Sequence, residues 1–124
     1  MILVVDDDSA DCEVLKLALK RAGYSVYCTR TARDALQVLE SITPGLLVVD
    51  LRMSDVDGFE LLRRVKAKAS LHGVPILVYT ASCSETDRQR SIDAGANDYA
   101  TKGSIGWDEL VARVRSLYPQ SSKN

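Results

Sequence analysis

Short apolar runs alternate along the chain with segments whose apolar residues recur every three or four positions. Five runs predict strands, at residues 2–5, 24–28, 46–50, 74–81 and 97–101. The first, third and fourth are almost continuously apolar, with no alternation of polar positions. Runs of this kind are typical of strands that are covered on both faces of a sheet.

Helical patterns follow each of these runs. Their expected apolar faces are Leu15, Ala18, Leu19 and Ala22; Ala32, Ala35, Leu36 and Leu39; Leu61, Leu62, Val65 and Ala69; Ile92; and Trp107, Leu110, Val111 and Val114. Cap residues support four of these helices. Asp8 or Ser9, Thr31 and Ser84 can begin helices, and Gly23 and Gly95 can end them; Pro119 ends the last helix.

The order of these elements gives five strand–helix units. Crossover connections of this length require parallel strands and right-handed connections, so the sequence predicts one doubly wound α/β domain. We place the domain at residues 1–119 and a polar tail at residues 120–124. Neither a repeat nor a second domain is visible in the sequence.

Composition narrows the possible functions. The chain has 124 residues, of which 46% are hydrophobic, and its formal net charge is −1, which fits a folded domain with no electrostatic preference for nucleic acid or an anionic membrane. No apolar run approaches the roughly 20 residues that a membrane span needs, and no signal peptide is visible. The three cysteines have no metal-binding spacing. We therefore expect a cytoplasmic protein without direct contact with nucleic acid or membrane.

Polar side chains gather where the predicted strands end. Asp6 and Asp7 follow the first strand, Asp50 the third, Thr80 the fourth and Lys102 the fifth. In a doubly wound sheet, ligands bind beyond the carboxyl ends of the strands, so these five residues are expected at one rim. Adjacent carboxylates are tolerable there if a divalent cation and the lysine lie among them. Oxygen ligands favour Mg²⁺.

Four stretches in this order resemble the receiver domain of two-component response regulators over nearly the whole chain. They are "ILVVDDD", "LLVVDLRMSDVDGFELL", "PILVYTA" and "AGANDYATKG". The resemblance implies a flavodoxin-like three-layer sandwich, with strand order 2-1-3-4-5 and five helices, in a single chemotaxis-regulator-like receiver domain at residues 1–119. It also implies a phosphoprotein of a phosphorelay that catalyses only its own phosphorylation and dephosphorylation.

The resemblance also implies roles for individual residues. Asp50 matches the phosphoacceptor, which takes a phosphoryl group from a sensor histidine kinase or a phosphotransfer protein. Asp6, Asp7, Asp50 and the backbone carbonyl of Arg52 match the ligands of Mg²⁺ (or Mn²⁺). Thr80 and Lys102 match the groups that contact the phosphoryl oxygens, and Thr80 and Tyr99 match the switch that signals to a downstream protein target. Arg52 and Ser82 match positions that influence phosphate lifetime.

The chain departs from the family pattern around the predicted site. Ser54 stands where the family usually has proline, and Val56 where it commonly has methionine. Gly103 replaces the proline that usually follows the lysine, and the loop to the last helix is one residue longer. Because a cis bond without proline costs about 2.5–4 kcal/mol, we expect a trans Lys102–Gly103 bond and a rearranged loop over residues 103–106.

Two other functions fit parts of the sequence. "DDDS" can be read as a D-x-D phosphatase motif with Asp6 as nucleophile and Asp8 as acid, although "VVDLRM" then has no role. The second alternative is a receiver-like interaction module that is never phosphorylated. We interpret Asp8, Asp55 and Asp57 as cap or loop residues.

Three surface features are interpreted structurally as well. His72 is expected to be a solvated surface residue, because a metal ligand needs partners that it lacks. Cys83 is expected to be inert. The predicted fourth helix, residues 84–94, has one large apolar residue, so we expect it to be the most mobile helix and part of the partner surface.

Overall fold

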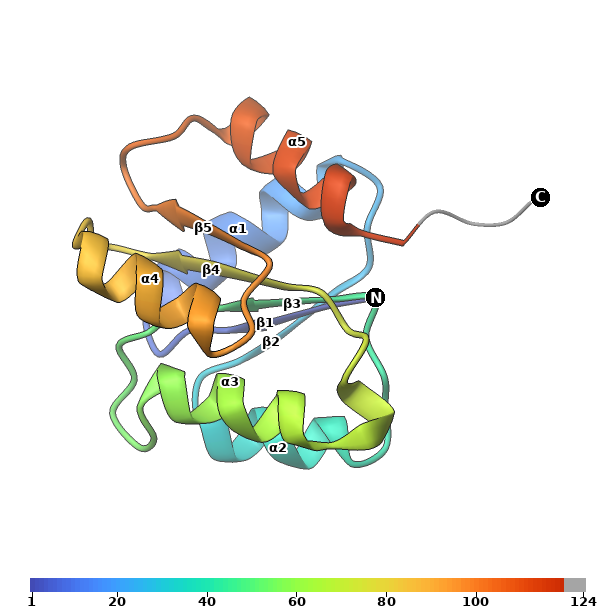
Figure 1. The fold of residues 1–124 in the computed structure, drawn as a ribbon. Coiled ribbons are helices and arrows are strands. Elements are labelled where there is room, and N and C mark those ends of the chain that lie inside the picture. Colours follow the sequence, from blue (N-terminus) through green and yellow to red (C-terminus); the bar gives the residue numbers. More distant parts are fainter. Residues whose placement is uncertain (120–124) are drawn as a thin grey trace.

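The structure is a computed structural model that describes residues 1–119, so the predicted tail at residues 120–124 lies outside the described residues. Its elements follow the predicted alternation (Figure 1). In chain order they are β1 (Ile2–Val5), α1 (Ser9–Arg21), β2 (Val26–Thr29), α2 (Ala32–Leu39), β3 (Leu46–Val49), α3 (Gly58–Ala67), the 3₁₀ turn η1 (Ala69–Leu71), β4 (Ile76–Thr80), α4 (Glu85–Asp93), β5 (Asp98–Thr101) and α5 (Trp107–Leu117).

The five strands form one parallel sheet in the order β2-β1-β3-β4-β5, which confirms the expected topology. The register aligns the last residues of the central strands. Val5 pairs with Val49, which pairs in turn with Val78 near the end of β4. The residues that follow these strands therefore meet at one edge of the sheet.

Helices cover both faces of the sheet, as the continuous apolar strands predict (Figure 1). Alternate strand residues such as Ile2 and Val4 pack with Leu15 and Leu19 of α1 and with Leu110 of α5. The other alternate positions face α2 and α3, in the cluster of Leu3, Val5, Ala35, Leu39, Leu47, Val49, Leu62 and Val65. Every residue of β1, β3 and β4 is buried, because each face has its own layer of helices.

Predicted helix caps are confirmed in three places. The side chains of Asp8, Thr31 and Ser84 each accept a hydrogen bond from the backbone N–H three residues ahead. Gly23 and Gly95, at φ +102° and +116°, end α1 and α4 in the left-handed conformation that favours glycine. These caps fix where the first and fourth helices begin and end beside the sheet.

Two element boundaries differ from the prediction. β2 begins at Val26 rather than at residue 24, because the Tyr24 N–H donates to the Leu19 carbonyl of α1 at 3.1 Å instead of joining the sheet. The Tyr24 ring packs against Tyr118, with ring centroids 5.0 Å apart. α3 ends at Ala67, since Lys68 adopts an extended conformation, and Ala69 is exposed in η1. Ala69 is therefore not part of the apolar face of α3.

Two predicted apolar contacts are also wrong. Ile92 of α4 is 37% exposed, whereas Ser91 is fully buried and its hydroxyl donates to the Asp87 carbonyl at 2.8 Å. The buried Ser91 hydroxyl is thus satisfied within the helix itself, and α4 turns a small polar residue rather than Ile92 toward the interior. Trp107 is 44% exposed, and the edge of its ring system meets the Tyr79 ring.

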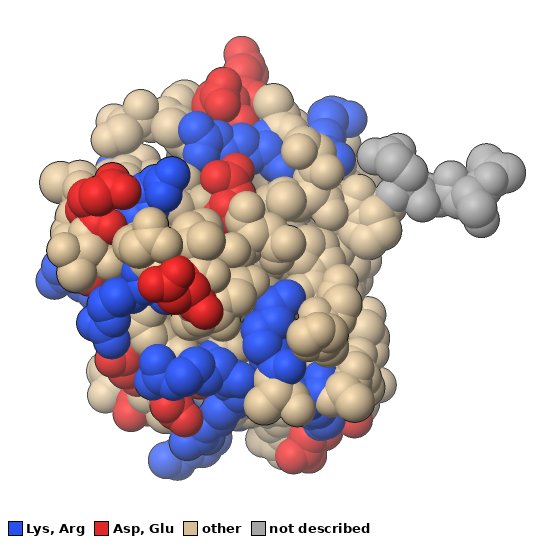
Figure 2. Space-filling model, viewed as in Figure 1, with Lys and Arg blue, Asp and Glu red and all other residues tan. Residues whose placement is uncertain are grey.

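The surface carries basic and acidic side chains together. On the face shown in Figure 2, blue and red atoms are interspersed over α3 and α4. On α3, Glu60 pairs with both Arg63 and Arg64, at 2.8 and 3.1 Å, which agrees with a solvated helix face. Within residues 1–119, no helix combines the length and apolarity needed to cross a membrane.

Candidate functional site

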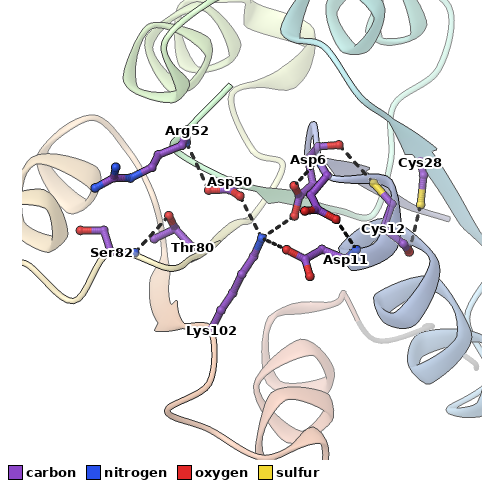
Figure 3. A network of polar contacts seen from close by, with 10 residues as sticks. Asp6, Asp11, Cys12, Cys28, Asp50, Arg52, Thr80, Ser82 and Lys102 are labelled. Carbon is purple, nitrogen blue, oxygen red and sulfur yellow. Dashed lines mark hydrogen bonds and ion pairs between the residues drawn. The ribbon is translucent and has the colours of Figure 1, made fainter. Parts of the chain in front are cut away.

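The predicted rim residues meet beyond the carboxyl ends of β1, β3 and β5. The Lys102 amine, from the end of β5, lies 2.7 Å from Asp6 Oδ2 and 2.9 Å from Asp50 Oδ2 (Figure 3). It also lies 2.8 Å from Oδ2 of Asp11 on α1. One ammonium group therefore donates to three carboxylates. Asp6 and Asp50 are separated by 44 positions in the sequence, and only the parallel sheet brings them together.

Hydrogen bonds orient both carboxylate oxygens of Asp50. The backbone N–H of Arg52 donates to Oδ1 at 3.2 Å, and Lys102 donates to Oδ2 at 2.9 Å. The Asp50 backbone is tied to β1, since its N–H donates to the Val5 carbonyl at 2.9 Å. The side chain is 10% exposed, so it is held in place yet open to a reactant.

Asp6 is more deeply placed, with a side chain that is 4% exposed. Its oxygens accept from the Asp8 N–H at 3.0 Å and from Lys102. Burial raises the pKa of Asp6 above its usual value, and the hydrogen bond from Lys102 offsets part of that rise. A carboxylate in this position is costly to the fold, which is typical of a site kept for its chemistry.

Lys102 is anchored at both ends. Its backbone N–H donates to the Thr80 carbonyl at 2.7 Å, and its amine reaches the carboxylates. Burial acts to lower the pKa of Lys102, but hydrogen bonds to Asp11, Asp6 and Asp50 outweigh it and raise that pKa. The expected trans Lys102–Gly103 bond is confirmed, since residues 1–119 contain no cis peptide, and Gly103 takes φ +82°.

Thr80 and Tyr99 are connected to α4 through Ser82. Thr80 is fully buried, and its hydroxyl accepts a long 3.5 Å hydrogen bond from the Ser82 N–H (Figure 3). The hydroxyl of Tyr99, itself buried, donates to the Ser82 carbonyl at 2.7 Å. The Ser82 hydroxyl donates to Asp87 of α4 at 2.6 Å. A short polar path thus leads from the rim to α4.

Asp7 and Arg52 lie at the exposed side of the rim. Within residues 1–119, the Asp7 carboxylate makes no hydrogen bond or ion pair, and the Arg52 side chain is likewise free. In Figure 3 the Arg52 guanidinium points away from Asp50, toward the side of Thr80 and Ser82. The structure therefore does not bring Asp7 into the contacts around Lys102.

The donor chemistry fits a hard divalent cation. The carboxylates of Asp6 and Asp7 follow β1, and the carboxylate of Asp50 and the carbonyl of Arg52 follow β3, so the groups predicted to hold the cation are all oxygens at the ends of two neighbouring strands. In the part of the chain described by the structure, no three acidic, histidine or cysteine side chains are arranged so that they could hold a metal ion as they stand. Mg²⁺ does not require such an arrangement, because it is commonly held by one or two carboxylates and several waters.

Two residues important for the site were missed in the sequence. Asp11 contacts Lys102, and its only signal is its place one helical turn after Asp7. A Cβ at Gly58 would lie 2.8 Å from the Asp50 carbonyl oxygen, so α3 approaches the Asp50 backbone as closely as glycine allows. The sequence signal for Gly58 is that it is a glycine in the first position of a predicted helix, directly after Asp57, which caps α3.

The other residues considered for chemistry have structural surroundings. Asp8 caps α1, and Asp55 accepts from the Ala32 and Arg33 N–H groups at the start of α2. His72 is exposed, and its ring nitrogen lies 3.2 Å from the Lys66 carbonyl. Burial raises the pKa of Cys12 to about 12, so its thiol stays protonated.

Comparison with known proteins identifies the family. The model of the response regulator receiver domain matches residues 2–115. Response regulator MprA of Mycolicibacterium vanbaalenii is 41% identical over 116 residues, which cover 94% of this chain and 49% of that protein. The chain therefore spans about half the length of this curated relative.

Solved structures agree with this match. A Chloroflexus aurantiacus protein described as a response regulator is 35% identical, with a TM-score of 0.89 and 94% coverage of both chains. The receiver domain of a Pseudomonas aeruginosa sensor histidine kinase is 28% identical, with a TM-score of 0.85 and 94% coverage of both chains; that protein has a magnesium ion in its active-site cleft. This chain belongs to the response regulator receiver family.

Proposed function

We propose, from its membership of the receiver family, that this chain accepts a phosphoryl group on Asp50 from the phosphohistidine of a sensor histidine kinase or phosphotransfer protein. The observation that carries the proposal is the orientation of Asp50. Its carboxylate is held open at the rim, with Arg52 N–H on one oxygen and Lys102 on the other. Phosphoryl transfer depends mainly on such positioning and on neutralised charge.

In the proposed step, an Asp50 oxygen attacks phosphorus in line with the leaving imidazole nitrogen. The new P–O bond forms as the P–N bond breaks, and the electron pair of the broken bond stays on the imidazole, which ends neutral with a proton from solvent. Lys102 faces the phosphoryl oxygens with its positive charge, and the Thr80 hydroxyl turns to donate a hydrogen bond to one of them.

Mg²⁺ or Mn²⁺ would be held by the carboxylates of Asp6, Asp7 and Asp50 and the carbonyl of Arg52. The bound cation supplies neutralisation of the phosphoryl charge. The exposed position of Asp7 supports this role, because its carboxylate makes no hydrogen bond or ion pair within residues 1–119 that a cation would have to displace. Asp6 and Asp50 keep Lys102 close to the same point.

The signal would leave through Thr80 and Tyr99. A phosphoryl group on Asp50 draws the Thr80 hydroxyl away from the Ser82 N–H, and Tyr99 follows through its bond to Ser82. Because Ser82 also bonds Asp87, the change reaches the surface formed by α4, β5 and α5, where a downstream protein binds. Arg52 and Ser82 flank the phosphoryl group and influence its lifetime.

The phosphatase alternative fits this geometry less well. Both Asp6 oxygens are already used by Asp8 N–H and Lys102, and its side chain is 4% exposed. The Asp8 carboxylate, which that reaction needs as an acid, accepts from the Asp11 N–H at the helix start. If the protein were an interaction module that is never phosphorylated, the contacts of Lys102 with three carboxylates would have no function to explain them.

The test is labelling with acetyl phosphate and Mg²⁺, followed by peptide mapping of the modified residue. We expect a phosphoryl group on Asp50, no labelling of Asp50→Asn, and none of the parent in EDTA. Phosphate on Asp6 would support the phosphatase, while an unlabelled parent would support the non-phosphorylated module. Circular dichroism of Asp50→Asn serves as the control for folding.

A further inference from the structure

Lys102 has a third carboxylate partner that the proposed chemistry does not use. Asp11 Oδ2 lies 2.8 Å from the Lys102 amine, across 91 positions of sequence. Asp11 comes from the first turn of α1, where its own N–H is fixed by the Asp8 cap at 2.9 Å. The Asp11 carboxylate thus sits on a rigid element and reaches the amine from the side of α1, as Figure 3 shows.

We propose that Asp11 is a positioning residue, which holds the Lys102 amine over Asp50. The inference rests on the proposed function, because it concerns the group that meets the phosphoryl oxygens. An ammonium has three N–H donors, and here each has one carboxylate acceptor. Asp6 and Asp50 must also serve a cation and a phosphoryl group. Asp11 alone can keep its bond to Lys102 throughout.

The loop after Lys102 explains why the amine needs this support. Gly103 has φ +82° and Gly106 follows three residues later, and an added Cβ at either would meet nothing within 4 Å. The Lys102 backbone N–H donates to the Thr80 carbonyl, next to a turn closed by a hydrogen bond from the Ser104 N–H to the Thr101 carbonyl. The four-carbon side chain of Lys102 is flexible, so directed acceptors decide where the amine rests.

The first test measures Lys102 directly, without metal or phosphate. Reductive methylation with formaldehyde, quantified at Lys102 by peptide mass spectrometry, reports how freely the amine reacts. We expect Asp11→Ala to raise the Lys102 methylation rate about threefold or more, on the scale of one lost charged hydrogen bond. Glu13→Ala is the matched control, since it removes an exposed carboxylate from the same helix and leaves the rate unchanged.

The second test measures the reaction. With acetyl phosphate and Mg²⁺, Asp11→Ala should slow phosphorylation of Asp50 by about threefold to tenfold, mainly in the maximal rate rather than in the donor concentration for half-maximal rate. Asp11→Glu should recover part of the loss, because its longer side chain still reaches the amine. In a Lys102→Ala background, Asp11→Ala should have no further effect, because Asp11 acts through the lysine.

Three results would overturn the inference: unchanged methylation and phosphorylation in Asp11→Ala, an equal effect of Glu13→Ala, or a persistent effect in the Lys102→Ala background. Failure of the proposed function is distinct from these, since the parent itself would then carry no phosphate on Asp50. The methylation experiment still decides whether Asp11 holds the amine in that case. Urea unfolding of Asp11→Ala, whose Asp11 side chain is 48% exposed, checks that the fold is retained.

Discussion

Gly58 gives the sharpest test of how the fold positions Asp50. The residue opens α3, and its N–H donates to the Leu51 carbonyl at 3.1 Å. A Cβ added there would lie 2.6 Å from Leu51 Cα and 2.8 Å from the Asp50 carbonyl oxygen. Both neighbours are backbone atoms that no side-chain rotation can move. Gly58→Ala must therefore shift either the start of α3 or the Asp50–Leu51 backbone.

The magnitude follows from two opposing effects. Replacing glycine by alanine at a relaxed position stabilises a protein by about 0.4–1 kcal/mol, because the unfolded chain loses entropy. Carbon atoms in contact prefer about 3.5–4.0 Å, so the 2.6 Å approach is too short by about 1 Å. Overpacking of this kind costs about 1–3 kcal/mol. We expect Gly58→Ala to lower the free energy of unfolding by about 1–2 kcal/mol net.

Urea unfolding followed by circular dichroism measures this change, and Gly73→Ala is the matched control. An added Cβ at Gly73 meets nothing within 4 Å, and its backbone is outside the left-handed region, so its stability should hold or rise slightly. Phosphorylation of Asp50 should slow in Gly58→Ala and not in Gly73→Ala. Equal or higher stability of Gly58→Ala would refute the close-contact argument; lower stability with unchanged phosphorylation would separate the contact from the positioning of Asp50.

Three further changes test other parts of the structure. Because burial raises the folded-state pKa of Asp6, its ionised form costs stability at neutral pH, and that cost disappears as pH falls below the folded pKa. Asp6→Asn should thus raise the free energy of unfolding by about 0.5–2 kcal/mol at pH 7, and by less near pH 3. A lower free energy of unfolding at pH 7 would mean that the ion pair with Lys102 stabilises the fold by more than the burial of Asp6 costs. Gly106→Ser should raise the free energy of unfolding, measured with urea, by about 0.5 kcal/mol. Helix α5 has no side-chain cap, and a serine at this position would complete a capping box with Glu109. Arg52→Ala should change the half-life of the phosphorylated protein while leaving the urea midpoint within error; an unchanged half-life would remove the Arg52 side chain from the reaction.

The fold was predictable because strand and helix patterns agree with each other at almost every position. Continuous apolar strands required helices on both faces, and parallel strands required the residues after them to share one edge. Asp6, Asp50 and Lys102 were therefore placed together before any distance was known. Their 2.7 and 2.9 Å contacts confirm that topology alone locates this part of the site.

Side-chain contacts of the helices were harder to predict. The sequence offers Ile92 as the inward residue of α4, but Ser91 is buried there instead. The Ser82–Asp87 hydrogen bond ties the first turn of α4 to the loop after β4, and the pattern of apolar residues carries no sign of this contact. Asp11 was missed for a similar reason. Its spacing in the sequence places it one helical turn after Asp7, which precedes α1, and only the rotation of α1 against the sheet turns its carboxylate toward Lys102.

The loop after Lys102 shows why a departure from the family pattern can leave the site intact. The lysine is held by its backbone bond to the Thr80 carbonyl and by its three carboxylates, and neither depends on the residue that follows. Beyond Lys102 the chain only has to return to α5, which it does through a turn and a glycine at φ +82°. A loop that departs from the family pattern is therefore compatible with a fixed amine. The same separation makes the carboxylates, rather than the loop, the part of the structure that sets the position of the lysine.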